Sequence, residues 1–238
     1  RLRFDAPAGR GLRLWSATVR PHASSCLNNP AHAIPCEGLW WLLSISHSPL
    51  MFYRLQFDPA LLDQWFVGTP VDCSGDEWAF RRLVNGEALD QSDLRTWRAM
   101  VKKEGRDLPF SFAGFDVPIV SHEVGELIAA LAPGQVQLPP VEVDGLSAGF
   151  HVLVATQTVR CIDEVRSEFT RWGAHDGRPN KVGEYRMFTR LRLDPTIIPK
   201  DLQIFRVLEW RGALVVTESL AESLRACVKA GLIYEPVA

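Results

Sequence analysis

One stretch of the sequence occurs twice, and this repeat constrains the fold more than any other feature. Residues 119–141 read IVSHEVGELIAALAPGQVQLPPV, and residues 215–237 read VVTESLAESLRACVKAGLIYEPV, 96 positions later. The two copies align without a gap, with apolar residues and a proline in step. A chain that repeats a pattern of this length is expected to repeat a unit of structure.

Each copy begins with a short β-branched run that ends in a hydroxyl residue, Ser121 in the first copy and Thr217 in the second. A hydroxyl at this place can accept a backbone N–H at the start of a helix. Glu123 and Glu218 follow in the first turn, where the helix dipole favours acidic residues. The pattern predicts a strand that runs directly into a capped helix.

Apolar residues in each predicted helix recur at spacings of four and then three. They are Val124, Ile128 and Leu131 in the first copy, and Leu220, Leu224 and Cys227 in the second. This spacing places each set on one side of a helix, and that side must be covered by other apolar residues. Because neither copy can bury its own stripe, we expect the two copies to cover each other.

Each copy also carries signals that end its helix and its last strand. Gly134 and Gly231 stand one helix length after the caps, where a left-handed residue terminates a helix. Pro140 and Pro236 occupy the same place in the two copies. Because proline donates no ladder hydrogen bond, they predict edge strands or strand ends.

A second match, between residues 55–62 and 191–198, lies 136 positions apart and suggests an insertion in the first half. We predict an α+β fold with a mixed, mainly antiparallel sheet, a few packed helices and two structurally related lobes from an internal duplication. The lobes are assigned to residues 51–149, with the insertion at 66–111, and to residues 150–238. Ser92 and the apolar residues after it predict a short helix over 92–103.

The second lobe contains further strand signals. Residues 149–165 predict two strands with a bend at Thr156 and Gln157, and residues 203–216 predict a hairpin that turns at Arg211 and Gly212. Asp163 precedes the acidic stretch EVRSEFTRW, which indicates a capped short helix over 164–172.

Charge and composition narrow the class of protein. The net charge is −2 with a pI near 6.3, which gives no general attraction to nucleic acid. Residues 51–238 hold 21 basic and 26 acidic residues, and this acidic body favours a basic partner. No apolar run approaches the length of a membrane span. The five irregularly spaced cysteines favour a reducing compartment, and we expect a cytoplasmic protein.

Residues 1–50 lack both the helical and the strand period, and a clear strand pattern starts at Met51. We interpret them as an extension, disordered or translated from an upstream start, before a natural start at Met51. The segment contains residue types that bind zinc: His22, Cys26, His32 and Cys36. Because prolines interrupt it and no scaffold fixes a tetrahedral geometry, we predict no metal site.

No phosphate-binding loop, dinucleotide turn, nucleophile elbow or zinc-protease motif occurs, so we predict no catalytic residue and no cofactor. The remaining candidates for acid/base chemistry are Asp163, Glu164, Ser167, Glu168, His122, His151 and His175. An alternative function is therefore a small hydrolase with Asp163, Glu168 and His151 in a cleft between the lobes. We favour structural roles, because His122 falls in a first helical turn and His175 in a polar loop.

Tryptophans and one charged turn are the candidates for partner binding, because indole rings in polar surroundings anchor protein interfaces. The residues are Trp65, Trp78, Trp97, Asp163, Arg166, Trp172 and Trp210.

The motifs VRCIDEVRS, LRLDP and IFRV and the final repeat copy resemble the eleventh numbered immunity family of bacterial polymorphic toxin systems, formerly a domain of unknown function. The resemblance covers about residues 51–238. It implies a protein that binds and neutralises a cognate toxin or secreted effector without catalysis. An adaptor that handles a secreted effector without neutralising it is the other alternative.

Overall fold

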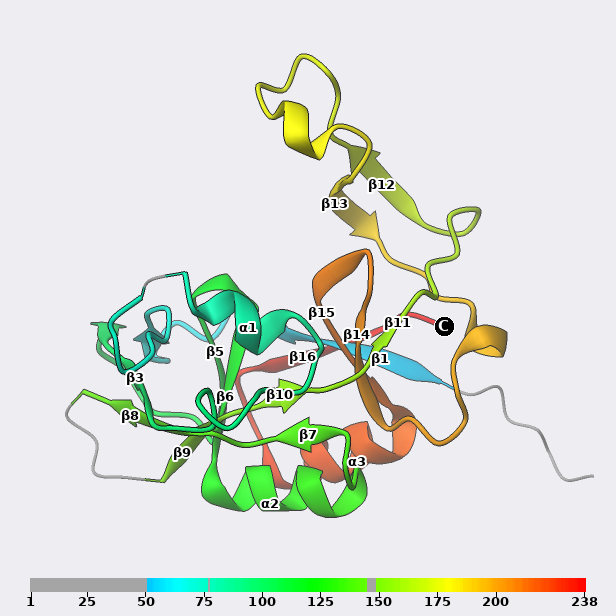
Figure 1. Ribbon diagram of the computed structural model, residues 1–238. Helices are drawn as coiled ribbons and strands as arrows, with labels where there is room; N and C mark the ends of the chain where they lie inside the picture. The colour runs from blue at the N-terminus through cyan, green and yellow to red at the C-terminus, as the bar shows by residue number, and fades with distance from the viewer. Residues whose placement is uncertain (1–50, 77, 145–148) are drawn as a thin grey trace, which may run out of the picture. The chain divides into compact units, whose positions relative to one another are not determined.

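The computed structural model describes residues 51–238 except 77 and 145–148. The described residues form two five-stranded sheets, three two-stranded pairs and three α-helices (Figure 1). Most strand pairs are antiparallel, so the predicted α+β class and the mainly antiparallel pairing are confirmed. The expected extension and its pairs His22/Cys26 and His32/Cys36 lie outside the described residues.

The first sheet, called the β6 sheet, has the strand order β3-β8-β9-β6-β5. Its strands are β3 (Trp97–Ala99), β8 (Pro140–Val143), β9 (Phe150–Val152), β6 (Val117–Ser121) and β5 (Phe110–Ala113). β9 is the central strand, and its residue His151 lies opposite Val120 of β6 on one side and Pro140 of β8 on the other.

The second sheet, called the β15 sheet, has the order β11-β14-β15-β1-β16. Its strands are β11 (Thr158–Val159), β14 (Ile204–Val207), β15 (Trp210–Thr217), β1 (Phe52–Phe57) and β16 (Leu232–Pro236). Here Tyr53 of β1 lies opposite Val216 of β15 and Pro236 of β16. The sequence repeat aligns Val216 and Pro236 with the two partners of His151, so the two sheets share one register.

Equivalent hydrogen bonds also start the two long helices, α2 (His122–Leu131) and α3 (Glu218–Cys227). The first N–H of α2, on His122, donates to the Gly149 carbonyl at 2.7 Å, and that of α3, on Glu218, donates to the Met51 carbonyl at 3.0 Å. Each acceptor lies just before the strand that pairs with both ends of its repeat copy, Gly149 before β9 and Met51 before β1. The origin of this likeness in a duplication stays a prediction.

The two halves of the chain exchange the strands β1 and β9. β1 precedes the first copy of the repeat in sequence but lies between β15 and β16 of the second copy. β9 follows the first copy and lies between β8 and β6 of that copy. The boundary proposed between residues 149 and 150 therefore does not separate two sheets, because each half completes the sheet of the other.

The apolar stripes of α2 and α3 share one hydrophobic core, as predicted. Val124, Ile128, Leu220 and Leu224 are buried in a cluster with residues of both sheets. The last position of each stripe was predicted wrongly, because Leu131 and Cys227 are exposed. At the end of each helix the shared core takes the next residue instead, since Ala132 and Val228 are buried in the same cluster.

The helix ends follow the sequence signals with one exception. Ser121 caps α2 by accepting the Val124 N–H at 3.4 Å. Thr217 occupies the same position before α3 but makes no cap, because its hydroxyl donates to the Gln203 side chain at 2.6 Å. Gly134 and Gly231 both adopt left-handed backbone angles, with φ of 73° and 89°.

The segment 58–109 between β1 and β5 packs against the β6 sheet. It contains β2 (Phe66–Val67), α1 (Phe80–Val84), β3 and β4 (Val101–Lys103), and β2 pairs with β4. The helix expected over 92–103 is wrong: Trp97 and Ala99 are buried while Arg98 and Met100 are exposed, which is the period of a strand. Asp90 instead holds a turn by accepting the Ser92 and Asp93 N–H groups.

The corresponding segment 156–203 of the second half begins with β11 of the β15 sheet and adds buried residues such as Cys161, Leu191 and Leu193 to the core. Its middle part, residues 164–190, forms a mostly exposed hairpin. Its strands are β12 (Glu168–Arg171) and β13 (Tyr185–Arg190), which pair only with each other. The short helix expected over 164–172 is wrong, because the Asp163 carboxylate closes a turn onto Val165 and Arg166 and the chain then extends. The strand pattern is interrupted at Thr156 and Gln157, between β10 and β11, as expected, but three short strands, β9, β10 and β11, replace the two predicted over 149–165.

Other elements complete the chain. A short pair joins β7 (Val136–Gln137) to β10 (Val154–Ala155), and single 3-10 turns are η2 (Gly114–Asp116), η3 (Pro179–Lys181) and η4 (Pro195–Ile197). The β14–β15 hairpin turns at residues 208 and 209, and not at Arg211 and Gly212, which are part of β15. The match of 55–62 to 191–198 is not structural, because Leu55 lies in β1 while Leu191 lies outside the strands.

Candidate binding site

Two of the predicted interface tryptophans are core residues. The Trp65 indole N–H donates to the Ser111 hydroxyl at 2.7 Å, and the Trp97 indole N–H donates to the Asp93 carbonyl at 2.8 Å. Both rings are buried, Trp97 to 1% exposure. Their polar atoms and their surfaces are already satisfied inside the fold, so neither is available to a partner.

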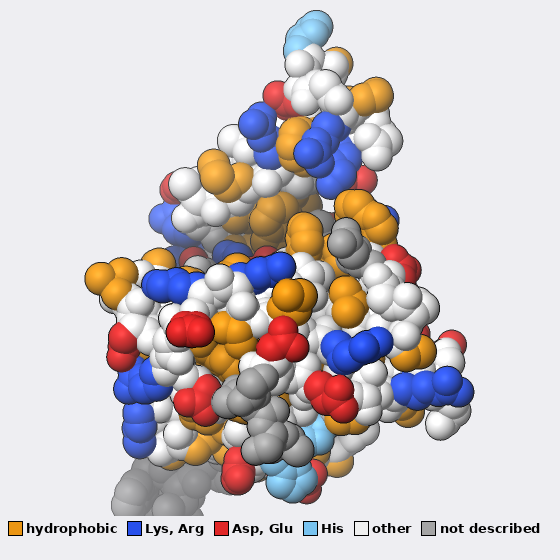
Figure 2. All heavy atoms as spheres, turned by 90° about the vertical axis from the view of Figure 1, so that its left-hand side faces the viewer, with side chains coloured by type: hydrophobic (Ala, Val, Ile, Leu, Met, Phe, Trp, Pro, Cys, Tyr) orange, Lys and Arg blue, Asp and Glu red, His pale blue; other side chains and the backbone are white. Residues whose placement is uncertain are grey.

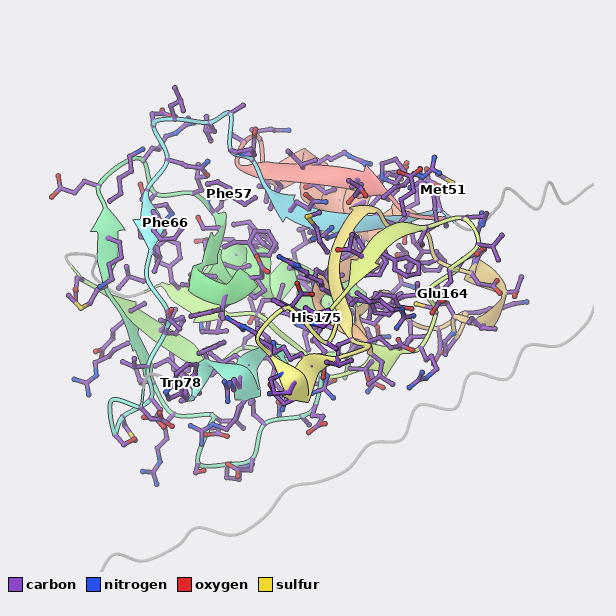
Figure 3. The ribbon with its side chains drawn as sticks, turned by 90° about the horizontal axis from the view of Figure 1, so that it is seen from above. Met51, Phe57, Phe66, Trp78, Glu164 and His175 are labelled. Carbon is purple, nitrogen blue, oxygen red and sulfur yellow. The ribbon has the colours of Figure 1, made fainter. Side chains whose placement is uncertain are left out.

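Trp78 is the exposed exception within the segment 58–109. Its side chain is 59% exposed, and the Arg81 guanidinium lies over the ring at 4.5 Å from the centroid. Its neighbour Phe80 stacks on Phe115, with centroids 4.3 Å apart and ring planes 11° apart. Figure 3 labels Trp78 on this part of the molecule, away from Glu164 at the hairpin. Large apolar rings that face solvent together are typical of binding surfaces.

These aromatic residues line a cavity of about 780 Å³. Its apolar wall is formed by Trp78, Phe80, Met100 and Phe115, and its charged rim includes Arg98, Lys102 and Asp144. Figure 2 shows the face that carries β3 and β8, where hydrophobic side chains lie among basic and acidic ones. We call this cavity the aromatic pocket. Its size falls in the range of cavities that hold a small molecule or the side chains of a partner.

The wall of the aromatic pocket includes a strained turn. Phe115 and Asp116 both have left-handed backbone angles, with φ of 61° and 57°, although neither is glycine. Such residues cost roughly 1–3 kcal/mol each and persist where surrounding structure fixes them. Phe115 is nevertheless 62% exposed, so the strain presents a large apolar ring to solvent. Stored strain that exposes a binding group is characteristic of functional sites.

A buried arginine holds this turn in place. Arg206 of β14 is 0% exposed and donates to the Arg211 carbonyl at 2.6 Å and to the Asp116 carbonyl at 3.4 Å. Burial lowers the pKa of Arg206 to about 10, while the nearby Asp116 carboxylate opposes the shift. The side chain therefore stays charged at neutral pH. Through Arg206, the β15 sheet supports the pocket built on the β6 sheet.

The predicted pair Asp163 and Arg166 lies at the base of the β12–β13 hairpin. The Arg166 side chain contacts the Asp163 carboxylate at 2.5 Å and donates to the Leu193 carbonyl at 2.7 Å. Hydrogen bonds from the Arg166 side chain and backbone lower the pKa of Asp163. Both residues are thus engaged in fixing the hairpin to the chain that follows it.

Trp172 and Trp210 belong to the same hairpin region. Trp172 is surrounded by cations, with Arg186, Arg178 and Lys181 at 4.8, 5.2 and 5.9 Å from its ring. Trp210 packs against Phe188 at 5.2 Å. A second cavity of about 930 Å³ lies between this hairpin, α1 and the β14–β15 turn, and charged side chains dominate its lining.

The residues considered for acid/base chemistry are not brought together. The ring centroid of His151 in β9 lies 5.5 Å from that of His122 at the start of α2, whereas Asp163 binds Arg166 and Glu168 pairs with Arg190 at the hairpin. Burial, with the charge of His122, lowers the pKa of His151. None of these residues lines the cavities of 780, 930 and 260 Å³. Within residues 51–238, apart from the undescribed positions, no cluster of His, Cys, Asp or Glu is arranged to hold a metal ion.

Sequence reasoning missed most of the aromatic pocket. Phe80, Met100, Phe115 and Arg206 carry no motif, and Trp78 was one of seven candidates. Arg206 alone leaves a signal, because it is a charged residue inside the otherwise apolar run IFRVL. A buried charge is costly unless it has a structural or functional task.

Comparison of the chain with families of known proteins and with characterised proteins finds no match. In the part of the chain that the structure describes, no helix has both the length and the apolar character needed to cross a membrane.

Proposed function

We propose that this protein is an immunity protein that binds a cognate bacterial toxin or secreted effector in the cytoplasm and blocks it without catalysis. The observation that carries the proposal is the aromatic pocket. Its exposed rings, Trp78 and Phe115, both lie against the ring of Phe80. The resemblance to the polymorphic-toxin immunity family supports the same conclusion from the sequence.

The pocket has the composition of an interface centre. Binding energy at protein interfaces concentrates in a few aromatic and arginine residues that become fully desolvated. Trp78 with Arg81 over its ring, and Phe115 stacked on Phe80, are residues of this kind. Because Arg206 already holds the turn of Phe115, little conformational freedom is lost on binding.

Overall charge acts at longer range than the pocket. Residues 51–238 contain five more acidic than basic residues, so the body as a whole attracts a basic toxin. Such attraction raises the association rate and is weakened by salt. The pocket then determines which surface of the toxin is held.

Co-expression with the toxin-like protein encoded beside this gene tests the proposal. We expect growth to be restored and the two proteins to co-elute as a stable complex. An adaptor would form the complex without restoring growth. A hydrolase would act on the toxin or its product with turnover, and His151→Ala would abolish its protection. The proposal would be overturned if no toxin-like protein is encoded beside the gene and a pull-down with this protein recovers no partner.

A further inference from the structure

We infer that the aromatic pocket receives an apolar side chain that the partner carries next to a carboxylate. This inference rests on the proposed function, since it takes the occupant to be a segment of a protein. It adds the chemistry that the pocket recognises.

The apolar half of this preference comes from the walls. Trp78, Phe80, Met100 and Phe115 line one cavity, and three of them have large exposed surfaces: Trp78, Met100 and Phe115. A volume of about 780 Å³ accommodates a large side chain together with the backbone that carries it. Covering these rings removes apolar surface from water, at about 25 cal/mol for each Å².

The shape of the pocket is fixed before binding. At Gly114, an added Cβ would lie 2.5 Å from the Thr69 hydroxyl oxygen, so the chain passes there without room for a side chain. The next two residues make the left-handed turn that Arg206 supports. A preformed apolar cavity favours a partner that inserts one side chain as a unit, and it disfavours a partner that makes only a flat contact.

The acidic half of the preference comes from the rim. Among the described residues, Arg98 and Lys102 line the pocket and Arg81 covers Trp78, and Asp144 is the one acidic residue of the lining. Among the ion pairs of the described residues, none involves Arg81, Arg98 or Lys102. A carboxylate beside the inserted side chain would pair with these cations, and a basic neighbour would be repelled. The local preference is thus opposite to that of the acidic body.

Lys103, the residue after Lys102, offers a matched control for a change at the rim. The Lys102 side chain lies along Gly68, where an added Cβ would come within 2.9 Å of the Lys102 Cε atom. Lys103 donates instead to the Leu62 carbonyl at 3.0 Å and does not line the pocket. Lys102→Glu and Lys103→Glu therefore change the net charge equally, but only the first changes the rim.

The experiment titrates the full-length chain with three capped tripeptides: acetyl-Glu-Phe-Glu-amide, acetyl-Lys-Phe-Lys-amide and acetyl-Glu-Ala-Glu-amide. Binding is followed by NMR at the Trp78 indole N–H, identified by its absence from a Trp78→Phe variant. We expect the Glu-Phe-Glu peptide to bind about fivefold more tightly than Lys-Phe-Lys. The Glu-Ala-Glu peptide should leave the signal unchanged.

Lys102→Glu should remove or reverse the difference between the two phenylalanine peptides, and Lys103→Glu should preserve it. Equal affinities of the two peptides for the unaltered protein, or no response of Trp78 to either, would overturn the inference. The proposed function is judged separately by co-expression. Protection from the toxin with no peptide selectivity defeats only this inference, and peptide selectivity without protection defeats only the proposed function.

Discussion

The two five-stranded sheets are alike, whereas the segments inserted into them are not. Tyr53 of β1 and His151 of β9 occupy the same register in the two sheets, and equivalent N–H groups start α2 and α3. The segment 58–109, by contrast, packs on its sheet and forms most of the aromatic pocket, while residues 164–190 of the other segment form an exposed hairpin. We therefore expect recognition to depend on the inserted segments, which differ, and not on the sheets, which are alike.

The largest loss of stability is expected from substitutions that create equivalent cavities under the two long helices. Ile128→Ala in α2 and Leu224→Ala in α3 remove side chains that are 0% exposed in one shared core. Each should lower the free energy of unfolding by about 2–5 kcal/mol. Chemical denaturation measures both, with Leu131→Ala as the exposed control in α2. If one of the pair were nearly neutral, the two halves would not contribute equally to the core.

A smaller loss of stability is expected from a substitution at a position where the two sheets are equivalent in register but carry different residues. Arg206 lies opposite Leu214, and Phe112 lies opposite Pro118, which the repeat aligns with Leu214. Arg206→Met leaves the Asp116 and Arg211 carbonyls without their donor, which should cost about 1–3 kcal/mol.

Thermal unfolding gives the stability of this variant, and the Phe115 ring signals in NMR report the turn. Arg160→Met is the matched control, because Arg160 is 74% exposed and paired with Glu209. We expect the control to stay within about 0.5 kcal/mol of the unaltered protein. An Arg206→Met protein with unchanged stability and an unchanged Phe115 environment would show that the arginine does not support the pocket.

The smallest effect concerns the base of the hairpin. The pKa of Asp163 is lowered in the folded protein, so its contribution to stability is complete above the ordinary aspartate value of about 3.9. That contribution is lost as pH falls through the lower, folded-state pKa. The Val165 and Arg166 amide signals, whose N–H groups donate to Asp163, should shift with a midpoint below 3.9. Asp163→Asn should abolish this transition, and a midpoint at or above the ordinary value would contradict the geometry.

Local parts of the fold could be predicted from the sequence because short-range chemistry determines them. The β-branched run, the Ser121 cap and the helix-terminating Gly134 act within one turn of each other. The exchange of β1 and β9 could not be predicted, because the period of a strand indicates which face is buried but not which strand lies beside it. Thr217 failed as a cap for a similar reason, since the Gln203 side chain, just before the neighbouring strand β14, accepts the Thr217 hydroxyl.

The site was less predictable than the fold. Trp65, Trp78 and Trp97 are alike in sequence context, and only the packing separates two core residues from one exposed ring. The spacing of Leu94, Trp97 and Val101 suits a helix, yet strand pairing of Trp97 with Val141 prevailed. Contacts with residues far away in the sequence determined each of these outcomes, and the pattern of a single sequence does not show which residues make those contacts.

The most direct test of the account compares one tryptophan from each inserted segment. Isothermal titration should measure the affinity of the purified toxin-like partner for Trp78→Ala and for Trp172→Ala. We predict that Trp78→Ala weakens binding at least about 30-fold, the loss typical of an interface hot spot, and that Trp172→Ala changes it less than about threefold. Unchanged binding by Trp78→Ala, or a larger loss with Trp172→Ala, would contradict the assignment of recognition to the aromatic pocket.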